Sequence, residues 1–280
     1  MSEPAATYGL QFPQLCFIGA GNMAKAIIVG LVESGYPAQN IIASNRSVEK
    51  LQELEKSLSI RTSTDNLFAA KQAEVIILAV KPLIVPDVCE QISSVITDQM
   101  FISVAAGITT QSIQQSLKAK NPVIRAMPNT PCLLSKGAIG IFTGDSLSTS
   151  QKNLVLQLFK PIGEVVIIDE EQQMDIVTAL SGSGPAYYFY LSQALIEAGV
   201  ELGLSEDICT QLINQTALGS AEMLNQVPLQ SAKDLRQAVT SPNGTTDAAT
   251  RLFDEHKMNE TIRKAVVKAT QRGIEMSKGK

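Results

Sequence analysis

The chain has 280 residues, of which 45% are hydrophobic and 18% charged, and its formal net charge is −4. This composition is typical of a globular protein and excludes a disordered chain, and the acidic balance disfavours nucleic-acid binding, which needs a basic face. No apolar run approaches the roughly 20 residues of a membrane span, and the opening MSEPAATYGLQFPQ lacks the features of a signal peptide.

The cysteines and the histidine do not predict a metal site. Cys16, Cys89, Cys132 and Cys209 lie far apart with no CxxC pair, and His256 is the single histidine. We expect no metal, reduced and mostly buried thiols, and a cytoplasmic location. His256 stands between charged neighbours in DEHKMN, which favours an exposed position near a helix end over a catalytic role.

The N-terminal part of the chain alternates short apolar runs with amphipathic segments. The runs are rich in Val and Ile and lack polar alternation, which is typical of strands covered on both faces. With helix-like segments such as 22–34 and 48–58 between them, they predict an α/β domain with a doubly wound parallel sheet. We expect the last two runs to form a hairpin at the sheet edge. The runs cover residues 15–19, 41–44, 75–80, 101–106, 123–127, 138–142 and 164–169.

After Glu170 the strand signals stop and helical spacing takes over. We therefore predict an α/β domain over 1–171 and an all-helical domain over 172–280. Pro185 and Ser205 match the residues that begin helices. The helical segments cover residues 172–180, 185–202, 205–226, 231–239, 245–255 and 259–277.

The segment GPAYYFYLSQALIEAGVELGL (184–204) is apolar over most of a helix circumference. Such a helix must be buried by more than one neighbour. A second copy of the chain in a homodimer is the favoured neighbour in a domain of this size, and a central helix in a monomeric bundle is the alternative.

The segment FIGAGNMAKAI places Gly19, Gly21 and Ala24 in the pattern GxGxxA between a strand and a helix. Gly19 allows a tight turn, Gly21 allows a pyrophosphate to approach the backbone, and Ala24 allows close helix–strand packing. The helix N-terminus supplies the positive end of a dipole for the phosphates. In this context the pattern predicts a dinucleotide site rather than a packing turn.

The end of the second strand reads Ser44-Asn45-Arg46-Ser47 and has no carboxylate that could bind the 2′-hydroxyl of NAD. An arginine between hydrogen-bonding groups suits the 2′-phosphate of NADP, because guanidinium binds phosphate oxygens bidentately. A solvated surface arginine is the alternative, and the pattern favours NADP.

Three further segments follow predicted strands or join the domains. Lys81 in AVKP is either a cofactor-facing cation or a surface residue, and the sequence does not decide between them. Asn129 and Thr130 in MPNTP offer polar groups near the nicotinamide end of the site. The turn SGSGPAY (181–187) either holds an anion on its free amides or packs as a hinge.

The ordered series FIGAGNMA, VKP, AAGI, RAMPNTP, SGSGPAY and LRQAVTSPNGTT resembles the pyrroline-5-carboxylate reductase family over nearly the whole chain. The family signature usually reads SPGGT, and this chain has Asn243 where the first glycine is common. Asparagine tolerates a left-handed backbone better than other non-glycine residues, so the departure is mild.

The resemblance implies an oxidoreductase that reduces 1-pyrroline-5-carboxylate to L-proline with NADPH or NADH, the last step of proline biosynthesis. It implies that residues 1–171 form a Rossmann-type dinucleotide-binding domain and that residues 172–280 form a helical domain for dimerisation and substrate binding. It also implies a homodimer that assembles further, for example into a decamer. The substrate residues would be Ser241, Gly244, Thr245 and Thr246, placed partly across the dimer interface. The cofactor residues would be Gly19, Ala20, Gly21, Asn22, Met23, Ala24, Asn45, Arg46, Ser47, Asn66, Ala79, Val80, Lys81, Pro82, Ala105, Ala106 and Gly107.

Reducing a cyclic imine needs hydride at carbon and a proton on nitrogen, and a protonated imine is already electrophilic. Orientation and hydrogen bonds can then carry the reaction, with Thr246 as the catalytic hydrogen-bonding residue at the ring nitrogen. A β-hydroxyacid dehydrogenase would need a lysine on the helix after SGSGPAY, and that segment contains none. A protein that binds NADP without turnover is the non-enzyme alternative.

Overall fold

Contacts divide the chain into two compact units, each described here by itself. The sheet unit comprises residues 1–182 and 269–280, and the helical unit comprises residues 183–268. Helix α12 (Met258–Ser277) contributes to both units. The structure is a computed structural model that describes residues 12–144, 147–226 and 231–277.

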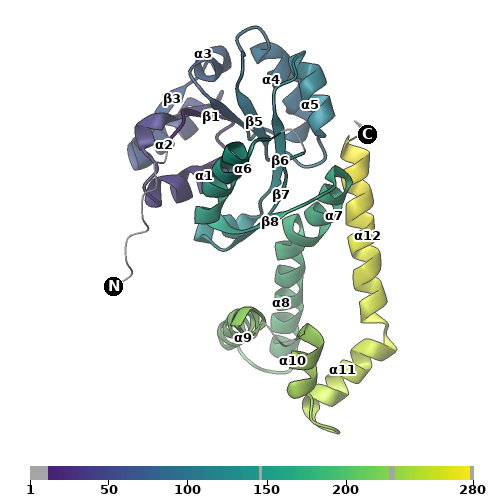
Figure 1. Ribbon diagram of the computed structural model, residues 1–280. Helices are drawn as coiled ribbons and strands as arrows, with labels where there is room; N and C mark the ends of the chain where they lie inside the picture. Colours follow the sequence, from purple (N-terminus) through teal and green to yellow (C-terminus); the bar gives the residue numbers. More distant parts are fainter. Residues whose placement is uncertain (1–11, 145–146, 227–230, 278–280) are drawn as a thin grey trace. The chain divides into compact units, whose positions relative to one another are not determined.

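Within the described residues, the sheet unit contains one eight-stranded sheet (Figure 1). The strands are β1 (Leu15–Ile18), β2 (Ile41–Ser44), β3 (Arg61–Ser63), β4 (Val75–Leu78), β5 (Met100–Ser103), β6 (Val123–Met127), β7 (Gly137–Phe142) and β8 (Gly163–Ile167). Their spatial order is β3-β2-β1-β4-β5-β6-β7-β8. Neighbouring strands are parallel except β6 and β7, which are antiparallel. The predicted α/β class is therefore confirmed, with a mostly parallel sheet.

Six of the described helices contribute to the cores on the two faces of this sheet. They are α1 (Asn22–Glu33), α2 (Val48–Leu58), α3 (Asn66–Lys71), α4 (Val85–Ile92), α5 (Thr110–Leu117) and α6 (Thr149–Phe159). Successive side chains of a strand point to opposite faces. Leu15 and Phe17 of β1 accordingly belong to one core with residues of α1, α2 and α6, while Cys16 and Ile18 belong to a second core with residues of α3, α4 and α5. The unbroken apolar runs arise because both faces are buried.

The hairpin predicted from the runs 138–142 and 164–169 is wrong. The corresponding strands β7 and β8 are parallel, and the connection between them contains helix α6. Parallel neighbours need a crossover of about a dozen residues or more, which a helix supplies. The antiparallel pair at this edge is β6 and β7. The sequence reading also missed β3, which has only three residues and reads RTS, without an apolar run.

Short helical segments connect several of these elements. The first of the two segments of the sheet unit ends in α7 (Met174–Val177) and a π-helix, Thr178–Gly182. The 3-10 helices are Ala38–Asn40, Pro82–Ile84, Thr130–Leu134, Lys160–Ile162 and Glu171–Gln173.

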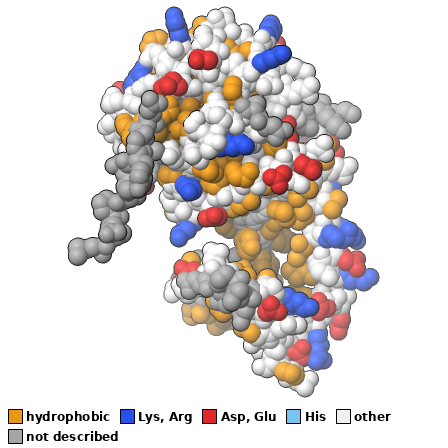
Figure 2. Space-filling model, in the orientation of Figure 1, with side chains coloured by type: hydrophobic (Ala, Val, Ile, Leu, Met, Phe, Trp, Pro, Cys, Tyr) orange, Lys and Arg blue, Asp and Glu red, His pale blue; other side chains and the backbone are white. Residues whose placement is uncertain are grey.

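The helical unit contains α8 (Gly184–Glu201), α9 (Glu206–Gln226), α10 (Ala232–Ala238), α11 (Thr245–Glu255) and the first part of α12. These bounds agree with the predicted helical segments to within a few residues. In the described part of this unit, Cys209 is the one buried hydrophobic residue. It packs against Gly199, where an added Cβ atom would lie only 2.6 Å from the Cys209 sulfur. Hydrophobic side chains lie on the visible surface of these helices (Figure 2).

The predicted burial of the cysteines and the predicted exposure of His256 are confirmed. All four cysteines are free and buried, and His256 is exposed at the C-terminal end of α11. Burial raises the pKa of the Cys16 and Cys89 thiols to about 12. Such thiols stay protonated and are poor nucleophiles at neutral pH.

Candidate functional site

The glycine loop lies between three strand ends of the sheet unit. Gly19 follows β1 with a φ of +107°, and its amide donates to the Ser44 carbonyl of β2 at 2.8 Å. A Cβ atom at Gly19 would lie 2.5 Å from the Ala79 carbonyl oxygen, beyond the end of β4. Only glycine fits both this backbone conformation and this contact. The loop is therefore fixed against the carboxyl ends of the neighbouring strands.

Gly21 opens helix α1 and leaves room beside it. It is the N-cap residue and forms no side-chain capping bond, so the amides of Asn22, Met23 and Ala24 begin the helix uncapped. Apart from Gly21, its two chain neighbours and the nearby helix backbone, no heavy atom of the described residues lies within 4 Å of the position that a Cβ atom at Gly21 would occupy. An open glycine beside an uncapped helix N-terminus fits an approaching phosphate. Ala20 and Ala24 are buried below the loop.

The end of β2 is held by a chain of side-chain hydrogen bonds. The hydroxyl of Ser44, which is fully buried, donates to Asn66 Oδ1 at 2.7 Å. Asn66 Nδ2 in turn donates to Gln91 Oε1 at 3.0 Å. Asn66, the first residue of α3, is thereby joined to the strand end that carries the next three predicted cofactor residues.

Those residues, Asn45, Arg46 and Ser47, form the turn between β2 and α2. Arg46 is exposed, and no carboxylate of the described residues forms an ion pair with it. Ser47 caps α2, and its hydroxyl lies 2.8 Å from Glu49 Oε2. This hydrogen bond lowers the pKa of Glu49. The turn therefore presents the Arg46 cation, with the Glu49 carboxylate close to it in the chain. Glu49 was not among the residues predicted for this site.

The remaining predicted cofactor residues follow β4 and β5. Ala79 and Val80 are half-buried, whereas Lys81 is exposed immediately before Pro82, which begins a 3-10 helix. After β5, Ala105 is buried, Ala106 is half-buried and Gly107 has a φ of +72°. These segments lie at the carboxyl edge of the same parallel sheet as the glycine loop, where doubly wound folds bind ligands.

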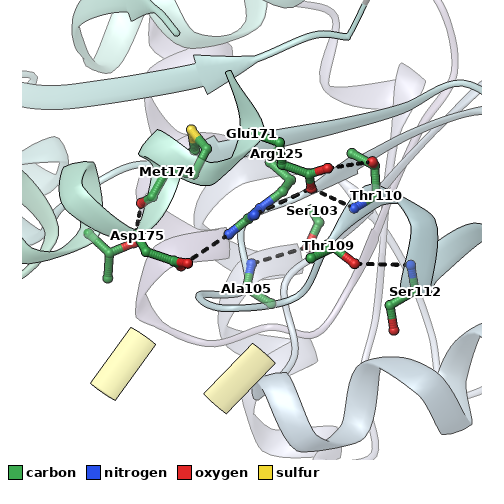
Figure 3. Close-up of polar contacts among 10 residues, drawn as sticks. Ser103, Ala105, Thr109, Thr110, Ser112, Arg125, Glu171, Met174 and Asp175 are labelled. Atoms are coloured by element: carbon green, nitrogen blue, oxygen red, sulfur yellow. Dashed lines mark hydrogen bonds and ion pairs between the residues drawn. The ribbon is translucent and has the colours of Figure 1, made fainter. Parts of the chain in front are cut away.

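A buried charge cluster lies next to this edge (Figure 3). Arg125 of β6 is only 4% exposed, and its guanidinium lies 3.3 Å from Glu171 Oε1 and 3.7 Å from Asp175 Oδ1. Glu171 also accepts from the Thr110 amide at 2.7 Å and from its hydroxyl at 2.9 Å. Because Thr110 begins α5, Glu171 places a carboxylate at the positive end of that helix.

Asp175 carries the unusual carboxylate of this cluster. Burial raises its pKa, and Arg125 opposes the change while Glu171 adds to it. Its Oδ1 atom has no hydrogen-bond partner among the described residues, and a Cβ atom at Gly273 of α12 would lie 3.3 Å from it. The cluster thus combines two carboxylates with one guanidinium.

Asn129 is used inside the protein. Its Oδ1 accepts from the Ala138 amide at 3.0 Å, and its Nδ2 donates to the Ser181 carbonyl at 3.0 Å. Asn129 therefore joins the loop after β6 to β7 and to the π-helix. Thr130 is exposed.

The predicted substrate loop lies in the helical unit. The Gly244 amide donates to the Ser241 carbonyl at 2.9 Å, which closes a four-residue turn with Pro242 second and Asn243 third. Asn243 has a φ of +59°, as a type II turn requires at its third position. Asn243 therefore adopts the left-handed backbone that the sequence predicts it can tolerate.

Thr245 and Thr246 begin helix α11 directly after this turn. Gly244 is the N-cap residue and supplies no side-chain bond. Within the described residues, no side-chain hydrogen bond involves the hydroxyls of Ser241, Thr245 or Thr246. Three hydroxyls and the first amides of a helix are therefore available to a ligand.

Four residues with structural roles at these sites were missed by the sequence reading. Arg125 and Glu171 are one pair, and a charged residue inside the apolar run VIRAM was the signal for a buried ion pair. Asp247 and Arg251 are the other pair, bound to each other in the first turns of α11. Their spacing of four residues was a signal for contact on a helix.

The described residues contain neither a metal-binding cluster nor a membrane-spanning helix. No group of three or more His, Cys, Asp or Glu side chains is arranged to hold a metal ion there. None of the described helices is long and apolar enough to cross a membrane.

The fold and the glycine loop define a Rossmann-type dinucleotide-binding oxidoreductase. A family model described as NADP oxidoreductase coenzyme F420-dependent matches residues 14–107, and one described as pyrroline-5-carboxylate reductase dimerisation matches residues 171–276. The chain is 40% identical to the pyrroline-5-carboxylate reductase of Pseudomonas aeruginosa over 266 residues, covering 95% of this chain and 97% of that protein. It therefore belongs to the pyrroline-5-carboxylate reductase family and is an oxidoreductase with a dimerisation domain.

Solved structures of the family have the same fold. The pyrroline-5-carboxylate reductase of Coxiella burnetii superposes with a TM-score of 0.88 at 39% identity, over 95% of this chain and 99% of that one. The Plasmodium falciparum protein, solved with NADP bound, gives 0.86 at 28% identity, over 96% of this chain and 100% of that one. The dimerisation match begins at residue 171, while the compact units of this chain divide after Gly182.

Proposed function

We propose that this protein reduces the C=N bond of 1-pyrroline-5-carboxylate to give L-proline, the last step of proline biosynthesis. One observation carries the proposal: in a chain of this family, helix α11 begins uncapped, with Thr245 and Thr246 beside a closed turn. The hydroxyls that form no side-chain hydrogen bond and the uncapped amides of this helix start suit a small anionic imine. The domain boundary near residue 171 remains part of this proposal.

NADPH is the proposed cofactor, with NADH as a possible second one. The open space at Gly21 and the uncapped amides of α1 fit its pyrophosphate. Arg46 would bind the 2′-phosphate, and the P. falciparum relative with NADP bound supports this choice. When bound, the reduced nicotinamide supplies the hydride. The segments 45–47, 79–82 and 105–107, with Asn66, would hold the rest of the cofactor.

The turn and the first residues of α11 would hold the substrate. Backbone amides at the start of the helix would bind its carboxylate, and Ser241 and Thr245 would add hydroxyl donors. The Thr246 hydroxyl would hydrogen-bond the ring nitrogen and orient the imine. This division of roles needs no ionisable catalytic side chain, because the protonated imine is already electrophilic.

We further propose a cytoplasmic homodimer that assembles into a larger homo-oligomer such as a decamer. The exposed apolar residues of α8, including Phe189 and Tyr190 at 66% and 76% exposure, support a partner copy. The four free thiols suit a reducing compartment.

The test is consumption of NADPH by the purified protein with 1-pyrroline-5-carboxylate, followed by absorbance and by proline formation. Thr246→Ala should lower kcat/KM by about 1–3 kcal/mol, roughly 5- to 150-fold, if the hydroxyl bonds the imine nitrogen. Thr261→Ala, an exposed threonine of α12, is the matched control and should leave kcat/KM unchanged.

Two results would contradict the proposal. Measurable NADPH binding without consumption would indicate a binding protein. Oxidation of a β-hydroxy acid with NADP, in the absence of imine reduction, would assign the chain to alcohol–ketone chemistry.

A further inference from the structure

Asp247 is held from two directions at the start of α11. Its Oδ2 accepts from the Asn243 backbone amide at 2.9 Å and from Arg251 Nη2 at 2.7 Å, while its Oδ1 accepts from Arg251 Nε at 3.2 Å. The Asp247 side chain is 16% exposed and that of Arg251 is 64% exposed. The carboxylate is thus bidentate to one guanidinium and also bonded to the turn.

The turn needs such a bond because Asn243 adopts a left-handed backbone. A non-glycine residue at a φ of +59° is destabilised by contact between Cβ and the carbonyl oxygen. The bond from its amide to Asp247 offsets this cost in the folded protein. The turn that carries Ser241 and Gly244 is therefore fixed by a side chain from the next helix.

The helix N-terminus stays open beside this bond. An acidic residue at the third position of a helix commonly bonds the backbone amide of the N-cap residue. Here the carboxylate binds the amide of Asn243, and the amide of the N-cap residue Gly244 donates to the Ser241 carbonyl. Because Gly244 has no side chain that could cap the helix, the amides of Thr245 and Thr246 stay available for a ligand.

Arg251 offsets the negative charge that Asp247 places near the proposed substrate site. A carboxylate beside the proposed carboxylate-binding amides would repel an anionic substrate. Two parallel hydrogen bonds from a guanidinium offset that charge with fixed geometry. The bidentate pair lets the acid order the turn with little repulsion of the substrate.

We propose that Asp247 is a positioning residue for the substrate-binding turn and that Arg251 is its counter-charge. This inference rests on the proposed function. It assigns Asp247 and Arg251 no contact with the reacting atoms, because they act through Asn243 and through the local charge.

The test compares Asp247→Ala, Asn243→Gly and the double variant in steady-state kinetics. Asp247→Ala should raise the KM for 1-pyrroline-5-carboxylate roughly 10-fold, the size expected for a lost hydrogen bond to a charged group, with the KM for NADPH unchanged. Asn243→Gly should restore most of the loss in the double variant, because glycine adopts the left-handed conformation without strain. Asp254→Ala, an exposed acid in the last turn of the same helix, is the control and should behave as wild type.

Arg251→Gln separates the charge from the turn. It should raise the substrate KM more at low than at high salt, because salt screens the unpaired carboxylate of Asp247 that is left behind. A salt-independent effect would remove the counter-charge role of Arg251.

Amide hydrogen exchange at Asn243 gives a readout that does not depend on turnover. Protection in the wild type and its loss in Asp247→Ala would support the contact. Wild-type protein that fails to reduce the imine would refute the proposed function alone, and the exchange result would still test the turn. Unchanged substrate KM in Asp247→Ala, an equal rise in both KM values, or no recovery by Asn243→Gly would overturn the positioning role.

Discussion

The sheet unit buries most of its large apolar side chains within one chain, whereas the helical unit leaves most of its large apolar side chains exposed. In the sheet unit, β1, β2, β4 and β5 are buried along their whole lengths. In the described part of the helical unit, Cys209 alone reaches that burial among hydrophobic residues. Large apolar side chains exposed in such number mark an interface. The dimerisation match over residues 171–276 agrees with this difference.

The two units also treat charge differently. The sheet unit contains the Arg125 cluster, in which the guanidinium is 5% exposed. In the helical unit, the described ion pairs of Arg251 and Lys257 involve cations that are 64% and 70% exposed. Removing a buried partner leaves an unpaired charge, so substitution of Arg125 should be costly, whereas substitution of Arg251 or Lys257 should be mild.

The largest effect is expected from breaking the apolar surface of the helical unit. Leu191 and Leu195 of α8 are four residues apart and 42% and 43% exposed. The double variant Leu191→Glu/Leu195→Glu should sediment as a 30.0 kDa monomer and lose activity by roughly 100-fold or more, because each buried leucine contributes about 1.5–3 kcal/mol. Asn153→Glu/Gln157→Glu on exposed positions of α6 is the matched control. A dimeric, active Leu variant would place the interface on another face.

The next effect is loss of stability in the sheet unit. Arg125→Met leaves the buried Asp175 carboxylate and the half-buried Glu171 carboxylate without their cation. It should lower the free energy of unfolding by about 3–5 kcal/mol, measured by urea denaturation. Lys25→Met is the control, because its pair with Glu53 is exposed and should contribute little to stability. An equal decrease in the free energy of unfolding in both variants would mean that the buried cluster contributes no more to stability than an exposed ion pair.

A smaller effect should separate cofactor binding in the sheet unit from substrate binding in the helical unit. Arg46→Ala should weaken NADPH binding by about 1.5–3 kcal/mol, roughly 10- to 150-fold in Kd, since it removes a charged partner of the 2′-phosphate. The Kd for NADH and the KM for the imine should change little. Lys56→Ala at the far end of α2 controls for general charge loss, and equal weakening of NADH would remove the role of Arg46.

The smallest effect concerns Asp175 and depends on pH. Burial raises its pKa above the ordinary 3.8, so the folded protein holds this proton more tightly than the unfolded chain does. The group therefore adds stability at pH below 3.8, and this contribution is lost as pH rises through the folded-state pKa. Asp175→Asn should remove that dependence, with a gain in stability relative to wild type that appears only above this window. Parallel stability–pH curves, measured by urea denaturation, would contradict it.

The amino-acid sequence by itself determined the class of fold and the nature of most elements. Apolar runs such as VIILAV predicted buried strands, and helical spacing predicted α8 to α12, because these patterns depend only on neighbours in the chain. The glycine loop was equally readable, since Gly19 and Gly21 serve a local turn. The assignment of individual residues to cofactor and substrate remains a prediction.

Tertiary structure decided what depends on partners far apart in the sequence. The direction of β8 beside β7 follows from a helical crossover, so proximity of the two apolar runs in the chain was misleading. Arg125 and Glu171 are 46 residues apart, and Asn129 and Ser181 are 52 apart. Local propensity carries no information on such pairs, because burial creates the need for a partner and the fold selects which one meets it.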